Sequence, residues 1–179
     1  QHVEQELQKG TYIAVGEIGL DLYWDKTSLD IQKKAFIHQI ELAKKHQLPI
    51  AIHVRDSFNE AIEIIEKYND EKLRGVFHCF TGGKAEAKRV IKLGGFYMGI
   101  GGVLTFKNSG LDTTIKDIDL QHLILETDAP YLAPTPFRGK RNESKHIVTI
   151  AQKLAEVHQI SLEKVAEVTT RNAQELFGL

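Results

Sequence analysis

The sequence predicts an α/β fold in which a parallel sheet is covered by helices. Short apolar runs rich in valine and isoleucine alternate with longer segments whose apolar residues recur at helical spacing. About five strands are expected in strand–helix–strand order, and this order produces parallel sheets with helices outside. No linker, repeat or low-complexity segment divides the 179 residues, so we expect residues 1–179 to form a single domain.

Each element has a local sequence signal. Glycine and proline end the periodic segments, and Ser161 and either Asp56 or Ser57 are suitable N-caps for helices. A separate closing turn is expected at 172–177. The expected helices are 1–9, 28–47, 57–68, 84–93, 111–117, 147–157 and 162–168, and the expected strands are 12–21, 49–53, 75–80, 96–101 and 123–128.

Four expected strands lead into side chains that can bind a metal, namely Glu17, His53, His78 and Asp128. The carboxyl ends of parallel strands meet at one face of a barrel, where active sites of that fold are assembled. The pattern therefore predicts a TIM-type (β/α) barrel. Because 179 residues fall short of the ~250 typical of that fold, we expect an incomplete barrel.

The chemistry of these residue types favours a divalent cation. A carboxylate at a buried strand end needs a compensating charge, and glycines beside Glu17 would let a ligand approach the backbone. Either histidine alone could equally be a hydrogen-bonded core residue, but four such residues at one end favour a metal site. Mixed imidazole and carboxylate ligands suit Zn, Mn or Fe, while carboxylate and water suit Mg.

Other side chains near the same strand ends allow alternatives. Arg55, Arg138 and Arg141 could hold phosphate or simply be solvated. Aromatic residues could stack on a base or cover the barrel mouth, and we favour covering. Cys79 is expected to point to the other side of its strand as a packed residue. The aromatic residues are Tyr23, Trp24, Phe80 and Tyr131, and the histidines expected to be solvated are His38, His46, His146 and His158.

Composition excludes several classes of protein. Lysine and arginine total 23 against 24 acidic residues, so no overall basic field recruits nucleic acid or membrane. The one cysteine excludes an internal disulfide framework. With no long apolar run and no visible signal peptide, we expect a soluble, cytoplasmic protein with no membrane partner.

Several motifs together resemble the TatD-related deoxyribonucleases of the metal-dependent hydrolase superfamily. The resemblance covers nearly the whole chain, in the order Gly-Glu-Ile-Gly-Leu-Asp (16–21), Leu-Pro (48–49) through His-Val-Arg-Asp (53–56), His-Cys-Phe-Thr-Gly (78–82), Glu-Thr-Asp-Ala-Pro-Tyr-Leu-Ala-Pro (126–134), Arg-Gly-Lys-Arg-Asn (138–142) and Thr-Arg-Asn-Ala (170–173). The family opens with a strand ending in His-x-His, which this chain lacks. The chain is therefore expected to be the C-terminal part of a barrel without its N-terminal βα units.

The resemblance implies a phosphodiesterase that acts on DNA, commonly from the 3′ end, with one or two divalent metal ions such as Mg, Mn or Zn. By motif, Glu17 would bridge two metals, and His53 and His78 would hold the second. Asp128 would bind the first metal and accept the proton of the attacking water. The alternatives are an amidohydrolase-like hydrolase of a small ester, lactone or amide, and a non-catalytic nucleic-acid-binding fragment.

Overall fold

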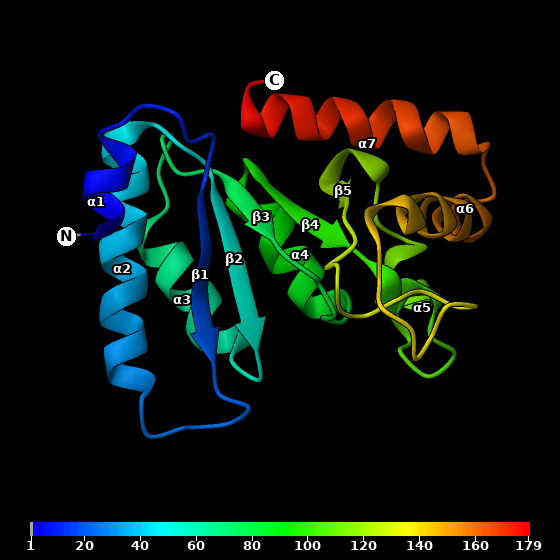
Figure 1. The fold of residues 1–179 in the computed structure, drawn as a ribbon, viewed down its shortest axis with the longest axis horizontal. Coiled ribbons are helices and arrows are strands. Elements are labelled where there is room, and N and C mark those ends of the chain that lie inside the picture. The colour runs from blue at the N-terminus through cyan, green and yellow to red at the C-terminus, as the bar shows by residue number, and fades with distance from the viewer. Residues whose placement is uncertain (1) are drawn as a thin grey trace.

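A five-stranded parallel sheet forms the centre of the molecule. The computed structural model describes residues 2–179, and its strands follow one another in sequence order across the sheet (Figure 1). They are β1 (Val15–Asp21), β2 (Ile50–Arg55), β3 (Gly75–Phe77), β4 (Phe96–Ile100) and β5 (Leu123–Leu125). Because β1 and β5 are the edges of an open sheet, the α/β fold and the incomplete barrel are both confirmed.

Helices connect and cover these strands. Helices α2, α3 and α4 lead from each strand to the next, which is the alternation expected from the sequence. The helices are α1 (His2–Leu7), α2 (Leu29–His46), α3 (Phe58–Tyr68), α4 (Lys84–Leu93), α5 (Leu111–Ile115), α6 (Ile147–His158) and α7 (Leu162–Phe177), with 3-10 turns at Gly102–Thr105, Leu120–His122 and Ser144–His146.

One face of the sheet makes the main core with the connecting helices. Successive strand side chains point to opposite faces, and the helix-side positions Ile50, Ile52, Phe77 and Met98 are almost completely buried. Burying each such side chain contributes about 1.5–3 kcal/mol relative to leaving it exposed. The core therefore fixes which residues of each strand face away from the helices. We call the opposite side the cavity face.

Helix α7 packs against the cavity face. Val76 of β3, Ile124 of β5 and Leu176 of α7 form a second, smaller buried cluster. Asn172, buried on α7, donates hydrogen bonds to the carbonyls of Leu120 and Leu123, at the beginning of β5. Figure 1 shows α7 crossing near the ends at which β3 to β5 begin. The opposite ends of the strands stay free of this helix.

The first strand differs from its prediction. Tyr12 and Ile13 are exposed and precede β1, so the apolar run does not begin a buried strand. Glu17 lies inside β1, where the register with β2 shifts between Val15 and Ile18. The space at Gly19 is taken by the neighbouring strand, because a Cβ there would lie 2.0 Å from the carbonyl oxygen of His53. The missing side chain of Gly19 therefore makes room for the backbone of β2 and not for a ligand.

Helix ends agree with the sequence in part. Ser161 caps α7, because its side chain accepts the Lys164 N–H, and this prediction is confirmed. Ser57 occupies the N-cap of α3, but its hydroxyl donates to the Leu20 carbonyl and so connects β1 with α3. The separate closing turn was wrong, since α7 continues without a break to Phe177.

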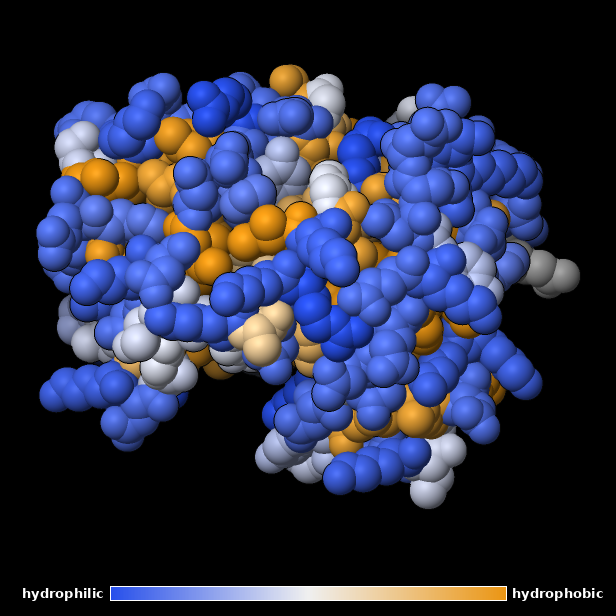
Figure 2. Space-filling view, turned by 180° about the vertical axis from the view of Figure 1, so that it is seen from behind, coloured by the Kyte–Doolittle hydropathy of each residue, from blue (hydrophilic) through white to orange (hydrophobic). Residues whose placement is uncertain are grey.

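The helix histidines are not all solvated, as the sequence had suggested. His146 is buried, stacks on Phe137 with 4.2 Å between ring centroids, and forms a hydrogen bond with Asn142. From behind, hydrophilic side chains cover most of the surface, with hydrophobic ones showing in a band across its middle (Figure 2). Within residues 2–179, no helix is both long and apolar enough to cross a membrane.

Candidate active site

The four residues predicted to bind a metal lie together on the cavity face. Glu17 Oε2 is 3.7 Å from His53 Nδ1, and Glu17 Oε1 is 3.7 Å from His78 Nε2. His78 Nε2 is also 3.2 Å from Asp128 Oδ1. Glu17 is therefore central, with a histidine on each side, and Asp128 is reached through His78. The chain brings together residues up to 111 positions apart in sequence, since 128 − 17 = 111.

Each of these histidines is also held by a second carboxylate. Asp21 Oδ2 lies 3.1 Å from His53 Nε2, and Glu126 Oε2 lies 2.9 Å from His78 Nδ1. The other Glu126 oxygen accepts the N–H of Cys79 at 2.7 Å. A carboxylate on one ring nitrogen fixes the orientation of the ring and leaves the other nitrogen for a different partner. The second nitrogen of His53 faces Glu17, whereas that of His78 faces both Asp128 and Glu17.

These contacts change the acidity of the groups. The hydrogen bond to Glu126 raises the pKa of His78 to about 9, against the effect of burial, with further help from the charges of Glu126, Glu17 and Asp128. Burial tends to raise the pKa of Asp21, but the Tyr23 N–H and the His53 ring outweigh it, so the pKa of Asp21 is lower than usual. The carboxylates of the site thus stabilise a positive charge on the His78 ring.

The carboxylates of the site are not equally buried. The Glu17 side chain is 52% exposed, so water can stabilise its charge without a cation. Asp128 is 24% exposed and Glu126 17%, and for these the cost of an uncompensated charge remains. The need for a counter-charge therefore comes from the number of carboxylates around the two histidines.

Backbone strain gathers at the same edge of the sheet. Asp56, Cys79 and Asp128 follow β2, β3 and β5, and their φ angles are 52°, 46° and 53°. Such left-handed conformations of residues other than glycine cost about 1–3 kcal/mol each and cluster at functional sites. Gly99 adds a different specialisation, because a Cβ there would lie 2.4 Å from Glu126 Oε2. Its missing side chain makes room for the carboxylate that holds His78.

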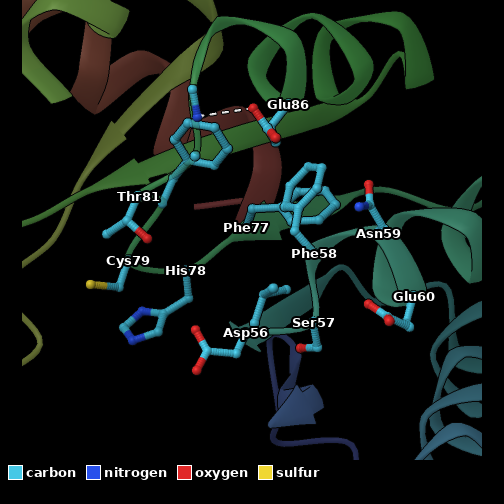
Figure 3. A pocket seen from close by; sticks show the side chains of 14 residues that line it. Asp56, Ser57, Phe58, Asn59, Glu60, Phe77, His78, Cys79, Thr81 and Glu86 are labelled. Atoms are coloured by element: carbon cyan, nitrogen blue, oxygen red, sulfur yellow. Dashed lines mark hydrogen bonds between the residues drawn. The ribbon is translucent and has the colours of Figure 1, made fainter. Parts of the chain in front are cut away.

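A cavity of about 670 Å³ opens over these residues. Its walls include Glu17, His53, His78 and Asp128, together with Arg55 and Tyr131. A second cavity of about 520 Å³ lies beside it and shares His78 and Cys79. Figure 3 shows His78 at one end of that second cavity and Glu86, which accepts the Gly83 N–H, at the other. The histidine is accessible from both.

The three arginines predicted to hold phosphate are placed differently. Arg55 lines the larger cavity. Arg138 stacks on the ring of Phe106 with its guanidinium carbon 3.8 Å from the centroid. Of the residues that the structure describes, those lining the larger cavity do not include Arg138 or Arg141. Of these three arginines, Arg55 is therefore the one that shares the cavity with the candidate ligands.

Aromatic residues near the mouth do not share one role. Phe80 is buried and packs against Phe58 as part of the main core. Trp24 and Tyr131 are 81% and 70% exposed, and Tyr131 also lines the larger cavity. That they cover the mouth stays a prediction. Their rings remain open to solvent.

Cys79 also differs from its prediction. Instead of pointing to the far side of the strand, it lines the larger cavity beside His78. The reason is its left-handed backbone, which interrupts the alternation of a strand. Burial and the nearby carboxylates raise the pKa of the thiol to about 12, so it remains protonated near neutral pH.

A family model described as TatD related DNase matches residues 1–178 of the chain. The chain belongs to the TatD family. The resemblance in its motifs is therefore confirmed over the whole length of the sequence, and the site described above is that of a TatD-family chain.

Two relatives carry similar names. The chain is 43% identical over 168 residues to a Bacillus subtilis protein called "uncharacterized metal-dependent hydrolase YabD", covering 93% of this chain and 66% of that protein. It is 35% identical over 168 residues to the Escherichia coli protein called "uncharacterized metal-dependent hydrolase YcfH", covering 93% of this chain and 63% of the relative. The chain spans about two thirds of the length of these curated relatives.

A solved structure has the same fold. The crystal structure of YjjV, a TatD homologue from Escherichia coli, superposes with a TM-score of 0.93 at 29% identity, covering 99% of this chain and 69% of that one. The match confirms that the open sheet of this TatD-family chain corresponds to part of a larger (β/α) architecture.

The donor set of the site suits a metal, although its contacts are pairwise. Within residues 2–179, no three His, Cys, Asp or Glu side chains are already placed to hold one ion together. Each histidine nevertheless has one nitrogen held by a carboxylate and the other turned to Glu17. This arrangement of a held imidazole facing an oxygen donor is the chemistry that Zn and Mn sites use.

Sequence reasoning missed Asp21 and Glu126. The signal for Glu126 was available, because it precedes Asp128 by two positions and strand alternation puts such residues on one side. Asp21 ends the same strand that carries Glu17 and pairs with Arg55 across the sheet. Which histidine each carboxylate would hold depends on the sheet register, and the sequence does not show it.

Proposed function

We propose that this TatD-family chain is part of a metal-dependent hydrolase that cleaves phosphodiester bonds of DNA. The observation that carries the proposal is Glu17 between His53 and His78, each histidine held from behind by a further carboxylate. The family name and the names of the relatives support the reaction class.

In this proposal, Glu17, His53, His78 and Asp128 hold one or two divalent ions, with Mg, Mn and Zn as candidates. Asp21 and Glu126 keep the imidazole rings in place. A divalent ion bound there lowers the pKa of a water molecule and stabilises charge on the scissile phosphate. Because the pKa of His78 is raised to about 9, binding of an ion to its Nε2 competes with a proton.

The chain's own residues would carry the other steps. Asp128 is partly buried at the cavity wall. It accepts a proton from the attacking water while the oxygen of that water forms a bond to phosphorus. Arg55 lines the same cavity and can hold two phosphate oxygens with its planar guanidinium. The bond between phosphorus and the 3′ oxygen of the remaining strand then breaks, that oxygen takes up a proton from water, and a nucleotide leaves. Arg138 and Arg141 would contact the strand farther from the reacting phosphate.

A nuclease assay with metal control tests the proposal. The full-length protein is stripped with a chelator, supplied separately with Mg, Mn or Zn, and incubated with single-stranded DNA labelled at either end. We expect nucleotides to be released only with metal, mainly from the 3′ end. Asp128→Asn should slow release by on the order of 10²- to 10⁴-fold, whereas Glu167→Asn, at an exposed residue of α7, should leave it unchanged.

Two results would contradict the proposal. One is rapid turnover of small esters, lactones or amides without cleavage of DNA, which would identify a hydrolase of a different substrate class. The other is DNA binding that weakens with salt while no nucleotide is released under any metal condition, which would identify a binding fragment.

A further inference from the structure

An exposed aromatic pair with a guanidinium stands at the end of β1. Trp24 is 81% exposed, and its ring meets that of Tyr23 edge-on, with 4.7 Å between centroids and 88° between planes. The guanidinium carbon of Arg55 lies 3.7 Å from the Tyr23 centroid and 5.9 Å from that of Trp24. We call Tyr23, Trp24 and Arg55 the aromatic platform.

The platform is attached to the candidate active site by direct contacts. The Tyr23 N–H donates to Asp21 Oδ1 at 2.9 Å, while Asp21 Oδ2 holds His53. The Leu22 N–H donates to the carbonyl of Arg55 at 2.9 Å. Arg55 itself lines the cavity that contains Glu17 and His53. The orientation of the platform is therefore set by the same residues that set the site.

From this arrangement we infer that Trp24 stacks on an unpaired base of a single-stranded DNA whose phosphate lies beside Arg55. The inference rests on the proposed function and names the form of substrate it would take. An open aromatic face binds any base by stacking, and an adjacent guanidinium binds the phosphate between bases. Bases within a duplex are already stacked on each other, so the platform favours single strands.

Charge supports this occupant. The chain has a formal net charge of −1, so a nucleic acid gains little from the overall field and must be held by local groups. Arg55 combines positive charge with two aromatic neighbours, the pairing that single-strand binders use. Among residues 2–179, no carboxylate lies within ion-pairing distance of the Arg55 guanidinium, which leaves it available for phosphate.

Tryptophan fluorescence tests the inference without turnover. The full-length protein, kept in chelator so that DNA is not cut, is titrated with a short dT strand and with an abasic strand of equal length and charge. The signal of Trp24 is the difference between the wild-type protein and Trp24→Phe. We expect saturable quenching of that signal by dT and little by the abasic strand.

Binding affinities of variants give a second readout. Trp24→Ala should weaken binding of the dT strand by roughly 5- to 150-fold, the range for loss of one stacked base, with a smaller loss for Trp24→Phe. Ile31→Ala, which truncates another exposed apolar side chain on α2, should bind like the wild-type protein. On the cleavage reaction, Trp24→Ala should raise KM much more than it lowers kcat.

The outcomes separate this inference from the proposed function. Equal quenching by dT and abasic strands, or unchanged dT affinity in Trp24→Ala, would overturn the platform even if DNA is cleaved. Base-dependent quenching with no cleavage under any metal condition would uphold the platform and contradict the nuclease. A Trp24 signal that responds to another protein but not to dT would also overturn it.

Discussion

The two faces of the sheet use the same strands for different purposes. On the helix side, Ile52 of β2 and Phe77 of β3 are almost fully buried in apolar packing. On the cavity face, the next residues along, His53 and His78, lie among carboxylates at the edge of a large cavity. Moving one residue along a strand therefore changes its role from stability to chemistry, because successive side chains point to opposite faces.

The comparison predicts that the cavity face can be altered without loss of folding. Glu17→Gln and Asp128→Asn should lower the rate of DNA cleavage by on the order of 10²- to 10⁴-fold, because each removes a charged group from the reaction centre. Their unfolding midpoints in urea, measured without metal, should stay close to that of the wild-type protein. A variant that lost stability and activity together would show that the two faces are not independent.

The helix side should respond in the opposite way. Ile52→Ala should reduce the free energy of unfolding by about 2–5 kcal/mol, because it leaves a cavity in the packed core. Ile52→Val is the matched control and should cost only about 0.5–1.5 kcal/mol. Denaturant titration measures both. If Ile52→Ala instead affected only catalysis, the assignment of this face to stability would be wrong.

A sharper test addresses the carboxylates behind the histidines. Glu126→Gln keeps the shape of the side chain but removes its charge, and it should weaken Mn or Zn binding by about 10- to 100-fold. Asp21→Asn should have a similar effect through His53. Isothermal titration calorimetry on the chelator-stripped protein measures the affinities. Unchanged metal affinity in both variants would show that these carboxylates do not support metal binding.

The smallest expected effect concerns Cys79, which lines the cavity without being suited to its chemistry. Its thiol pKa is raised to about 12, so at pH 8 the folded protein holds almost no thiolate and should react slowly with a disulfide reagent. Reactivity should increase as the pH approaches 12 and on unfolding in urea, which restores an ordinary thiol. Rapid modification of the native protein at pH 8 would indicate a reactive cysteine.

Much of this protein was determined by local sequence. The expected bounds of α4 match the structure, Ser161 caps α7, and strands alternate with helices as expected. Capping and periodicity depend on residues only a few positions apart, so the sequence contains them completely. The gathering of Glu17, His53, His78 and Asp128 was also foreseeable, because parallel strands bring their carboxyl ends to one edge.

Only the tertiary structure decided how these residues face one another. Asp21 holds His53 and Glu126 holds His78 because of the register between strands and the space left by Gly99. Cys79 turns into the cavity because of a single left-handed residue. The register between strands and the backbone conformation at a strand end are set by packing against other strands and helices. They therefore cannot be predicted from neighbouring residues in the sequence alone.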